Sequence, residues 1–202
     1  MNTRIIPDGI KIMNNTLLEQ FLKKPLTTGA VCASSESLAK ELTDSIGLET
    51  AGSAAELGPG TGAVTKVILE RIPEKCRFFT VELNPDVIRV FQQKFPAVTV
   101  YNDSAANLPE LIRRENLSSL DAVISGLPWA IFPDELQEQI LTAILQTLKP
   151  GGCFTTFAYL QGLLLPSGMH FRKRIKGMFS EVEKSPVVWN NFPPAFVYRC
   201  RK

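Results

Sequence analysis

The stretch AAELGPGTGAVTKVILE, residues 54–70, decides the fold that we expect for this chain. It begins as a short apolar segment around Glu56, which is typical of a buried strand. Gly58, Gly60 and Gly62 follow, and glycine lets a chain turn tightly and lets a ligand approach backbone N–H groups. The residues after the glycines have apolar side chains at helical spacing. The stretch therefore predicts a strand, a ligand-binding turn and a helix.

The rest of the chain repeats this alternation. Short apolar segments rich in Val, Ile or Phe predict strands buried on both faces, at residues 54–57, 78–83, 98–101, 121–125 and 152–159. Helical spacing occurs between them, at residues 63–72, 85–94, 108–115 and 134–148. Segments 182–189 and 195–201 favour an antiparallel pair at the sheet edge. The sequence predicts an α/β fold, a Rossmann-like, doubly wound, seven-stranded and mainly parallel sheet with a C-terminal antiparallel pair.

The composition is that of a globular domain with a sizeable core. The 202 residues are 45% hydrophobic, and a net charge of +2 gives no bulk argument for a nucleic-acid partner. The four cysteines lie far apart and His170 is the single histidine, so we expect no metal site. The sequence shows neither a signal peptide nor an apolar run long enough to span a bilayer. We expect a cytoplasmic protein, either soluble or attached to a membrane surface.

Ligands of doubly wound sheets bind beyond the carboxyl ends of the strands. Glu82 ends the second strand, where an acid is placed to bind both hydroxyls of a ribose; the alternative is a solvated charge. The glycine turn itself suits a dinucleotide or S-adenosylmethionine. Glu56 favours S-adenosylmethionine, because a carboxylate at the end of the first strand repels a pyrophosphate and holds the ammonium of a methionine.

Asn102, Asp103 and Ser104 follow the third strand and are placed to contact an adenine amino group, with a plain turn as the alternative. The residues expected to bind the cofactor all lie in these turns. They are Glu56, Gly58, Gly60, Thr61, Gly62, Glu82, Leu83, Asn102, Asp103, Ser104, Ser125, Gly126 and Leu127.

Four motifs resemble those of class I S-adenosylmethionine-dependent methyltransferases. They are ELGPGTG at 56–62, VELNP at 81–85, NDSA at 102–105 and LKPGG at 148–152. The resemblance covers roughly residues 53–159 and implies that S-adenosylmethionine is the cofactor. It divides the chain into an N-terminal extension of amphipathic or lid helices, residues 1–50, and a methyltransferase domain, residues 51–202.

Three further segments resemble bacterial phospholipid N-methyltransferases, which methylate phosphatidylethanolamine towards phosphatidylcholine, and their ornithine-lipid relatives. They are FLKKPLTTGAVCASSESLAKEL at 21–42, SGLPWAIFP at 125–133 and NNFPPAFVYRC at 190–200. Ribosomal RNA adenine dimethyltransferases are similar, but they carry an N-L-P-Y-type signature and a separate C-terminal helical domain. Here Ser125 and Gly126 replace the leading Asn, so no nucleic-acid substrate is expected. An RNA or small-amine methyltransferase and a cofactor-binding protein without turnover are the alternatives.

Methyl transfer to an amine requires groups that orient the amine. We expect Asp103, Tyr159 and the carbonyl of Gly126 to do so, and Trp129 to face the cationic centre, a contact worth roughly 0.5–2 kcal/mol. Ordinary core packing is the alternative for the two aromatic residues. Asp103, Trp129 and Tyr159 are therefore the candidate catalytic residues.

The N-terminal segment predicts contact with a membrane. Apolar side chains that include Phe21 fall near one helical face with Lys23 and Lys24 beside them, which is typical of an interfacial helix. A lid over the site is the alternative.

A second membrane contact is predicted near the end of the chain. Segment 170–179 is basic, and we expect Arg172 and Arg174 to contact lipid phosphates, with a solvated face as the alternative. The apolar segment 162–169 is expected as a loop that lines the entry of acyl chains. Together these features predict a peripheral enzyme of the inner membrane that acts on a phospholipid amine and prefers anionic lipids.

Overall fold

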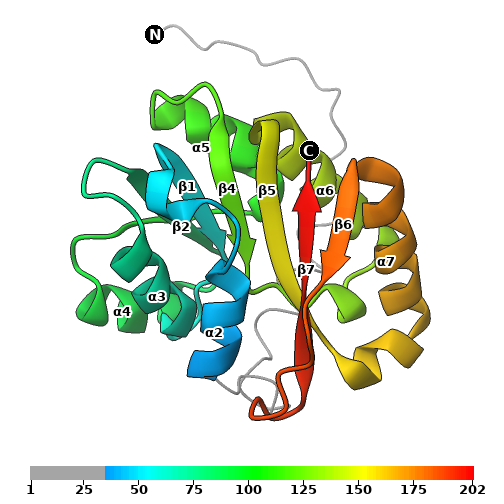
Figure 1. Ribbon diagram of the computed structural model, residues 1–202. Coiled ribbons are helices and arrows are strands. Elements are labelled where there is room, and N and C mark those ends of the chain that lie inside the picture. Colours follow the sequence, from blue (N-terminus) through cyan, green and yellow to red (C-terminus); the bar gives the residue numbers. More distant parts are fainter. Residues whose placement is uncertain (1–34) are drawn as a thin grey trace, which may run out of the picture. The chain divides into compact units, whose positions relative to one another are not determined.

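The computed structural model describes residues 35–202 and has one mixed sheet at its centre (Figure 1). The order of the strands is β3-β2-β1-β4-β5-β7-β6. The strands are β1 Ser53–Leu57, β2 Arg77–Glu82, β3 Thr99–Asn102, β4 Leu120–Ser125, β5 Leu148–Tyr159, β6 Glu181–Lys184 and β7 Ala195–Arg201. β1 to β5 pair in parallel, and β7 lies antiparallel between β5 and β6. The predicted fold class, including the C-terminal antiparallel pair, is confirmed.

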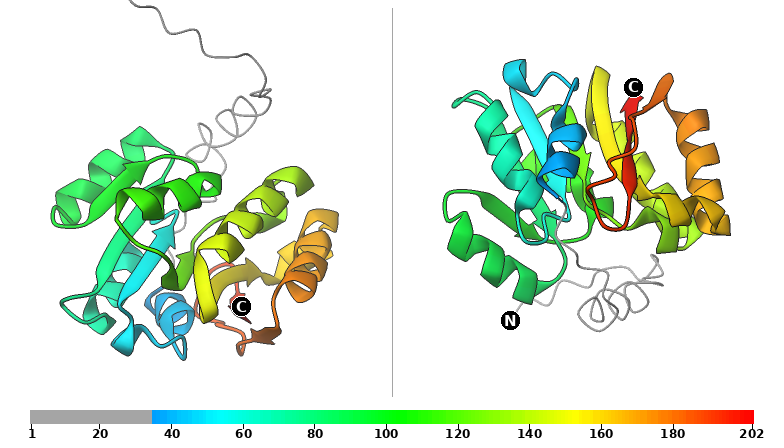
Figure 2. Two further views of the ribbon diagram at one scale, coloured as in Figure 1. Left: turned by 90° about the horizontal axis from the view of Figure 1, so that it is seen from above. Right: turned by 60° about the horizontal axis from the view of Figure 1, so that its bottom comes forward.

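Helices cover both faces of this sheet (Figure 2). The α-helices are α2 Glu36–Thr43, α3 Ala63–Arg71, α4 Pro85–Lys94, α5 Leu108–Arg114, α6 Asp134–Thr147 and α7 Pro166–Met178. Short 3₁₀ helices are η1 Leu48–Thr50, η2 Ala105–Asn107, η3 Trp129–Ile131 and η4 Leu160–Leu164. No helix within residues 35–202 has both the length and the apolar character needed to cross a bilayer.

Two hydrophobic cores follow from the alternation of side chains along the strands. In β1, Ala55 and Leu57 face the core formed with α5, α6 and α7, whereas Ala54 faces the core formed with α2 and α3. All of β1 is buried, as expected for a parallel strand covered on both sides. This packing fixes the carboxyl ends of the strands, where the site residues lie.

Two segments differ from the prediction. The strand expected over 182–189 ends at Lys184, because the Ser185 hydroxyl accepts the N–H of Val197 at 2.9 Å and Pro186 has no N–H to donate. The apolar segment expected as a loop over 162–169 is helical instead. It comprises the end of η4 and the first turn of α7, where proline is favoured because the first helical N–H needs no partner.

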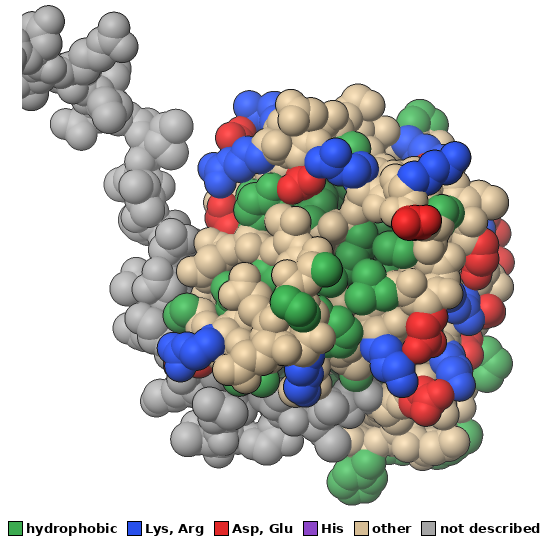
Figure 3. Space-filling model, turned by 90° about the vertical axis from the view of Figure 1, so that its left-hand side faces the viewer, with side chains coloured by type: hydrophobic (Ala, Val, Ile, Leu, Met, Phe, Trp, Pro, Cys, Tyr) green, Lys and Arg blue, Asp and Glu red, His purple; other side chains and the backbone are tan. Residues whose placement is uncertain are grey.

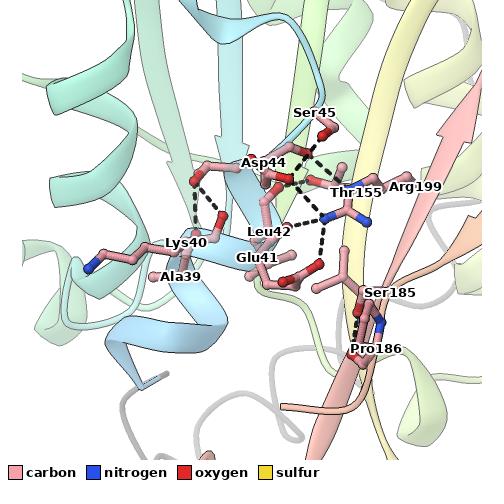
Figure 4. A network of polar contacts seen from close by, with 12 residues as sticks. Ala39, Lys40, Glu41, Leu42, Asp44, Ser45, Thr155, Ser185, Pro186 and Arg199 are labelled. Carbon is pink, nitrogen blue, oxygen red and sulfur yellow. Dashed lines mark hydrogen bonds and ion pairs between the residues drawn. The ribbon is translucent and has the colours of Figure 1, made fainter.

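Arg199 of β7 fastens α2 to the sheet (Figure 4). Its guanidinium donates to the Glu41 carboxylate at 2.6 Å, to the Glu41 carbonyl at 3.0 Å and to the Asp44 carbonyl at 2.9 Å. The Thr155 hydroxyl of β5 donates to the Leu42 carbonyl at 2.9 Å. Carbonyl groups at the end of a helix have no partner inside the helix, so these side chains satisfy the C-terminus of α2.

Arg199→Met should lower the free energy of unfolding by about 2–4 kcal/mol, because hydrogen bonds from a charged group contribute about 1.5–3 kcal/mol and Glu41 loses its partner. Urea denaturation measures this change. Arg89→Met is the matched control, since Arg89 is largely exposed and pairs with Asp86 on the surface, where a pair contributes less than about 1 kcal/mol. Equal losses in the two variants would contradict this account of α2.

Candidate functional site

The register of the sheet brings the ends of four strands to one level. The paired residues there are Leu57 with Val81, Leu57 with Ser125, and Glu82 with Asn102. β5 extends further than its neighbours (Figure 1). Ser125 pairs with Thr156, so Tyr159 lies three residues beyond this level, which is about 10 Å along a strand. The turns after β1, β2, β3 and β4 therefore share one edge, and Tyr159 lies farther out.

The turn after β1 depends on glycine for its backbone and its packing. Gly58, Gly60 and Gly62 have φ angles of 72°, 54° and 82°, in the left-handed region that favours glycine. A Cβ atom on Gly126, in the turn after β4, would lie 2.5 Å from the carbonyl oxygen of Gly58. The space beside Gly60 is open, since nothing lies within 4 Å of the place of a Cβ atom. The two turns thus touch through their backbones, and Gly60 leaves room for a ligand.

The Glu82 carboxylate lies against the glycine turn. It accepts the N–H of Asn84 at 3.0 Å. Burial raises the pKa of Glu82, while the backbone N–H groups of Asn84, Leu83 and Gly60 act in the opposite direction. A carboxylate next to glycine N–H groups and open space fits the ribose end of S-adenosylmethionine, so the residues present fit this cofactor.

Glu56 has a different position from the one expected. Its side chain is almost wholly buried, and its carboxyl group accepts the hydroxyl of Thr65 at 2.6 Å, between β1 and α3. Burial raises the pKa of Glu56 to about 8, and the nearby charge of Glu82 adds to this rise. The structure therefore places the Glu56 carboxyl group in a buried contact with Thr65 rather than in an open pocket. Contact between Glu56 and a methionine ammonium stays a prediction.

The raised pKa of Glu56 makes stability depend on pH. The native chain holds this proton more tightly than the unfolded chain, so the contribution is complete below about pH 4.5 and is lost as pH rises through about 8. The free energy of unfolding should decline over this range by on the order of 5 kcal/mol, because one pKa unit corresponds to about 1.4 kcal/mol. Urea midpoints at several pH values measure it. Glu56→Gln should remove this component, and parallel profiles for the two proteins would contradict it.

The turn after β3 is braced by its own side chains. The Asn102 amide donates to the Leu83 carbonyl at 2.9 Å, which links the turns after β2 and β3. Asp103 accepts the side-chain amide of Asn107 and the N–H of Ser104, both at 2.7 Å. The Ser104 hydroxyl caps η2. The predicted turn is present at the shared edge, and contact with an adenine stays a prediction.

Ser125 organises the turn after β4. Its buried hydroxyl accepts the N–H of Leu127 and the indole N–H of Trp129, both at 3.2 Å. The N–H of Gly126 donates to the Leu57 carbonyl at 2.8 Å, which joins this turn to the end of β1. Ser125, Gly126 and Leu127 therefore lie beside the glycine turn, as the sequence predicts.

The structure does not gather the three candidate catalytic residues into one group. Trp129 is only 3% exposed and stacks on Phe171 with ring centroids 4.7 Å apart, in the core under α5 to α7. This position agrees with the alternative of core packing, and contact between Trp129 and a substrate cation stays a prediction. Tyr159 contacts Phe157 and packs on the opposite face of the sheet. Asp103 is held at the start of η2.

Sequence reasoning missed two residues that support the site. Thr65 is the partner of Glu56; it is the third residue of α3 and lies nine positions after Glu56 in the sequence, a spacing that gives little signal of the contact. Gln137 is wholly buried and donates to the carbonyls of Trp129 and Phe132 at 2.9 and 3.1 Å. A glutamine within the apolar stripe of α6 was the available signal for Gln137.

The basic segment expected to contact lipid, residues 170–179, contains both paired and exposed cations. Arg174 donates to Gln137 at 2.8 Å and to Asp134 at 3.4 Å, so its guanidinium already has partners within the chain, and its contact with lipid phosphate stays a prediction. Arg172 is exposed, as are Lys173 and Lys176, and these three form no ion pair with residues 35–202. Phe21, Lys23 and Lys24 lie outside the described residues.

Comparisons with known proteins agree with this geometry. A family model described as a methyltransferase domain matches residues 54–152. The ornithine lipid N-methyltransferase of Singulisphaera acidiphila is 29% identical over 91% of this chain and 93% of its own length.

Solved structures share the fold at low identity. An O-methyltransferase from Bacillus cereus in complex with SAH matches with a TM-score of 0.66 and 15% identity, over 96% of this chain and 94% of that chain. The N-methyltransferase NodS from Bradyrhizobium japonicum has a TM-score of 0.62 and 12% identity, over 83% and 93% of the two chains. With the glycine turn, Glu82 and the strand order, these findings show that the chain belongs to the class I S-adenosylmethionine-dependent methyltransferases, with S-adenosylmethionine as its cofactor.

Proposed function

We propose that this enzyme methylates the amine head group of a membrane lipid. The observation that carries the proposal is the similarity to an ornithine lipid N-methyltransferase along nearly the whole of both chains. The substrate class is phosphatidylethanolamine with its partly methylated forms. Ornithine lipid is the second candidate, which the name of the relative favours.

The proposed roles of the site residues follow from their positions. The Glu82 carboxylate accepts hydrogen bonds from the ribose hydroxyls. The open space beside Gly60 lets the cofactor approach the backbone of the glycine turn. The carbonyl of Gly126, held beside Gly58, orients the amine. S-adenosylmethionine supplies a methyl group on a sulfonium centre. A primary amine has a pKa near 10, so its proton must pass to water before nitrogen attacks, and fixed positioning then supplies on the order of 7–11 kcal/mol at best.

The surface supports approach to a membrane. Exposed Leu164, Leu165 and Met169 lie at the junction of η4 and α7, and exposed Arg172 and Lys176 follow on α7. Apolar side chains next to cations that have no ion pair within residues 35–202 favour an anionic lipid surface, where each cation contributes about 1 kcal/mol. We therefore propose a peripheral enzyme on the cytoplasmic side of the inner membrane.

An RNA substrate has less support. On the side of the molecule shown in Figure 3, Lys and Arg side chains are mixed with Asp and Glu. A continuous positive surface, which RNA-binding proteins use to follow the phosphate backbone, is not seen on that side.

Labelled S-adenosylmethionine and defined vesicles test the substrate class. The full chain is incubated with anionic vesicles that contain phosphatidylethanolamine, ornithine lipid or neither, and lipid extracts are analysed by mass spectrometry. Methylated lipid from one of the two amine-bearing mixtures is expected, and the better substrate identifies the head group. The proposal would be contradicted if neither phosphatidylethanolamine nor ornithine lipid became labelled.

A further inference from the structure

We propose that the turn between β6 and β7 inserts Trp189 and Phe192 into the lipid bilayer and so holds the carboxyl edge of the sheet against the membrane. This inference rests on the proposed function, because an enzyme that methylates a lipid head group must bring its site to the bilayer surface. The proposal adds a membrane contact that is separate from the N-terminal segment and from α7.

The two aromatic side chains are unusually exposed. Trp189 is 71% exposed and Phe192 is 82% exposed, whereas Trp129, the other tryptophan, is 3% exposed. Single exposed apolar residues are common on soluble proteins, but two large aromatic rings three positions apart form a local apolar projection. Aromatic rings, tryptophan above all, favour the boundary between lipid and water.

The turn is held rigidly, so the exposure of the rings does not come from a loose loop. Asn191 lies between the two aromatic residues and is 3% exposed. Its side-chain carbonyl accepts the N–H of Ser35 at 3.0 Å, and its amide donates to the Pro193 carbonyl at 2.7 Å. The N–H of Val188 donates to the Ala195 carbonyl at 2.7 Å. Asn191 is thus held inward, while Trp189 and Phe192 on either side of it are exposed.

The turn lies at the same edge of the sheet as the site. Ala195 pairs with Tyr159 at the end of β5, and the N–H of Leu160 donates to the Pro194 carbonyl at 3.1 Å. In Figure 1 the β6–β7 turn is at the lower end of the molecule, where β5 also ends. Leu164, 82% exposed, follows β5 within five residues. Apolar projections from two parts of the chain therefore flank the end of β5.

The charges above these projections fit a bilayer. Arg172 and Lys176 follow the exposed Met169 by three and seven residues on α7, which is about 4–10 Å along a helix. Side chains of an interfacial surface enter the bilayer by about 5–10 Å, so these cations would lie at the level of the lipid phosphates. Lys184 ends β6 with its ammonium 5.0 Å from the centroid of the Phe196 ring, and its pKa is lowered by partial burial and by the charges of Arg172 and Lys176, as expected for cations gathered at one place.

Tryptophan fluorescence tests the insertion directly in the full chain. Emission of Trp189 is obtained by subtracting the spectrum of Trp189→Phe, in which the buried Trp129 remains. Anionic vesicles should shift this emission to shorter wavelength, and lipids brominated near the head group should quench it. Emission that vesicles leave unchanged would overturn the proposal.

Vesicle binding gives the second readout. Trp189→Ala with Phe192→Ala should weaken binding by about a hundredfold or more, because two large apolar side chains lose their burial in the bilayer. Leu69→Ala with Val90→Ala is the matched control, since these side chains on α3 and α4 are 40% and 48% exposed but lie outside the turn. Equal binding by the two double variants would overturn the proposal.

Two further outcomes separate the explanations. Acrylamide should quench the emission of Trp189 in the absence of vesicles. A Trp189 shielded from acrylamide would overturn the proposal, because another part of the chain or a second copy would then cover the turn.

Methyl transfer to amine lipid in detergent micelles tests the enzyme apart from the membrane. If the wild type methylates that lipid while Trp189 does not insert, this inference fails and the proposed function stands. If Trp189 inserts into vesicles but no amine lipid is methylated, the proposed function fails and the membrane contact stands.

Discussion

Replacing Gly126 by alanine should reduce methyl transfer by about a hundredfold or more while the chain stays folded. The new Cβ atom would lie 2.5 Å from the carbonyl oxygen of Gly58, and this neighbour is backbone, which cannot rotate away. The turns after β1 and β4 must therefore separate. A displacement near 1 Å at a reacting centre is enough to cost about a hundredfold in rate.

Gly177→Ala is the matched control for this change. Gly177 lies in α7, and nothing lies within 4 Å of the place of its Cβ atom. Turnover, cofactor affinity by calorimetry, and circular dichroism should be measured on both variants. Full activity in Gly126→Ala would mean that the contact between the two turns does not position the reacting groups.

Glu82→Ala should weaken binding of S-adenosylmethionine by about tenfold to a hundredfold. Hydrogen bonds to a charged group contribute about 1.5–3 kcal/mol, and the change removes the proposed contacts to the ribose. Glu82 ends a strand and is partly exposed, so the fold should survive.

Asp86→Ala provides the control for Glu82→Ala. Asp86 is an acid in the first turn of α4, its side chain is 71% exposed, and within residues 35–202 its ion-pair partner is Arg89 on the surface. Calorimetric titration should give wild-type affinity for this variant. An unchanged affinity in folded Glu82→Ala would remove Glu82 from the cofactor site.

The fold was predictable because its signals are local. The strand over residues 53–57, the glycines after it and the helix from Ala63 follow each other directly, so spacing alone indicates their order. Parallel pairing then places Glu82, Asn102 and the turn after Ser125 at one edge without further information. This is why the expected cofactor residues, although distant in sequence, lie in neighbouring turns.

The fine structure of the site was not predictable, because it depends on partners distant in sequence. Trp129 is a core residue because Phe171, forty-two positions later, stacks on it. Arg174 is turned inward because Asp134 and Gln137 of α6 lie opposite. The order of aromatic and basic residues along the chain does not indicate which of these side chains are buried and which are exposed.

The projection formed by Trp189 and Phe192 was missed for the same reason. The sequence pattern predicts a strand up to Trp189 and a family motif around Phe192, and neither pattern indicates where a side chain points. Burial of Asn191 against Ser35, 156 positions away, decides that the aromatic rings face outward. The alternation of apolar and polar residues carries no information on such a contact.

A competition between lipid and RNA tests the central claim most directly. Full-length protein, labelled S-adenosylmethionine, anionic vesicles containing phosphatidylethanolamine and ornithine lipid, and unmodified ribosomal RNA are combined, and label is counted after separation of organic and aqueous phases. Label in the organic phase, with methylated amine lipid identified by mass spectrometry and lost in Gly126→Ala, is the predicted result. Label confined to the RNA, with both lipids unmodified, would contradict the account.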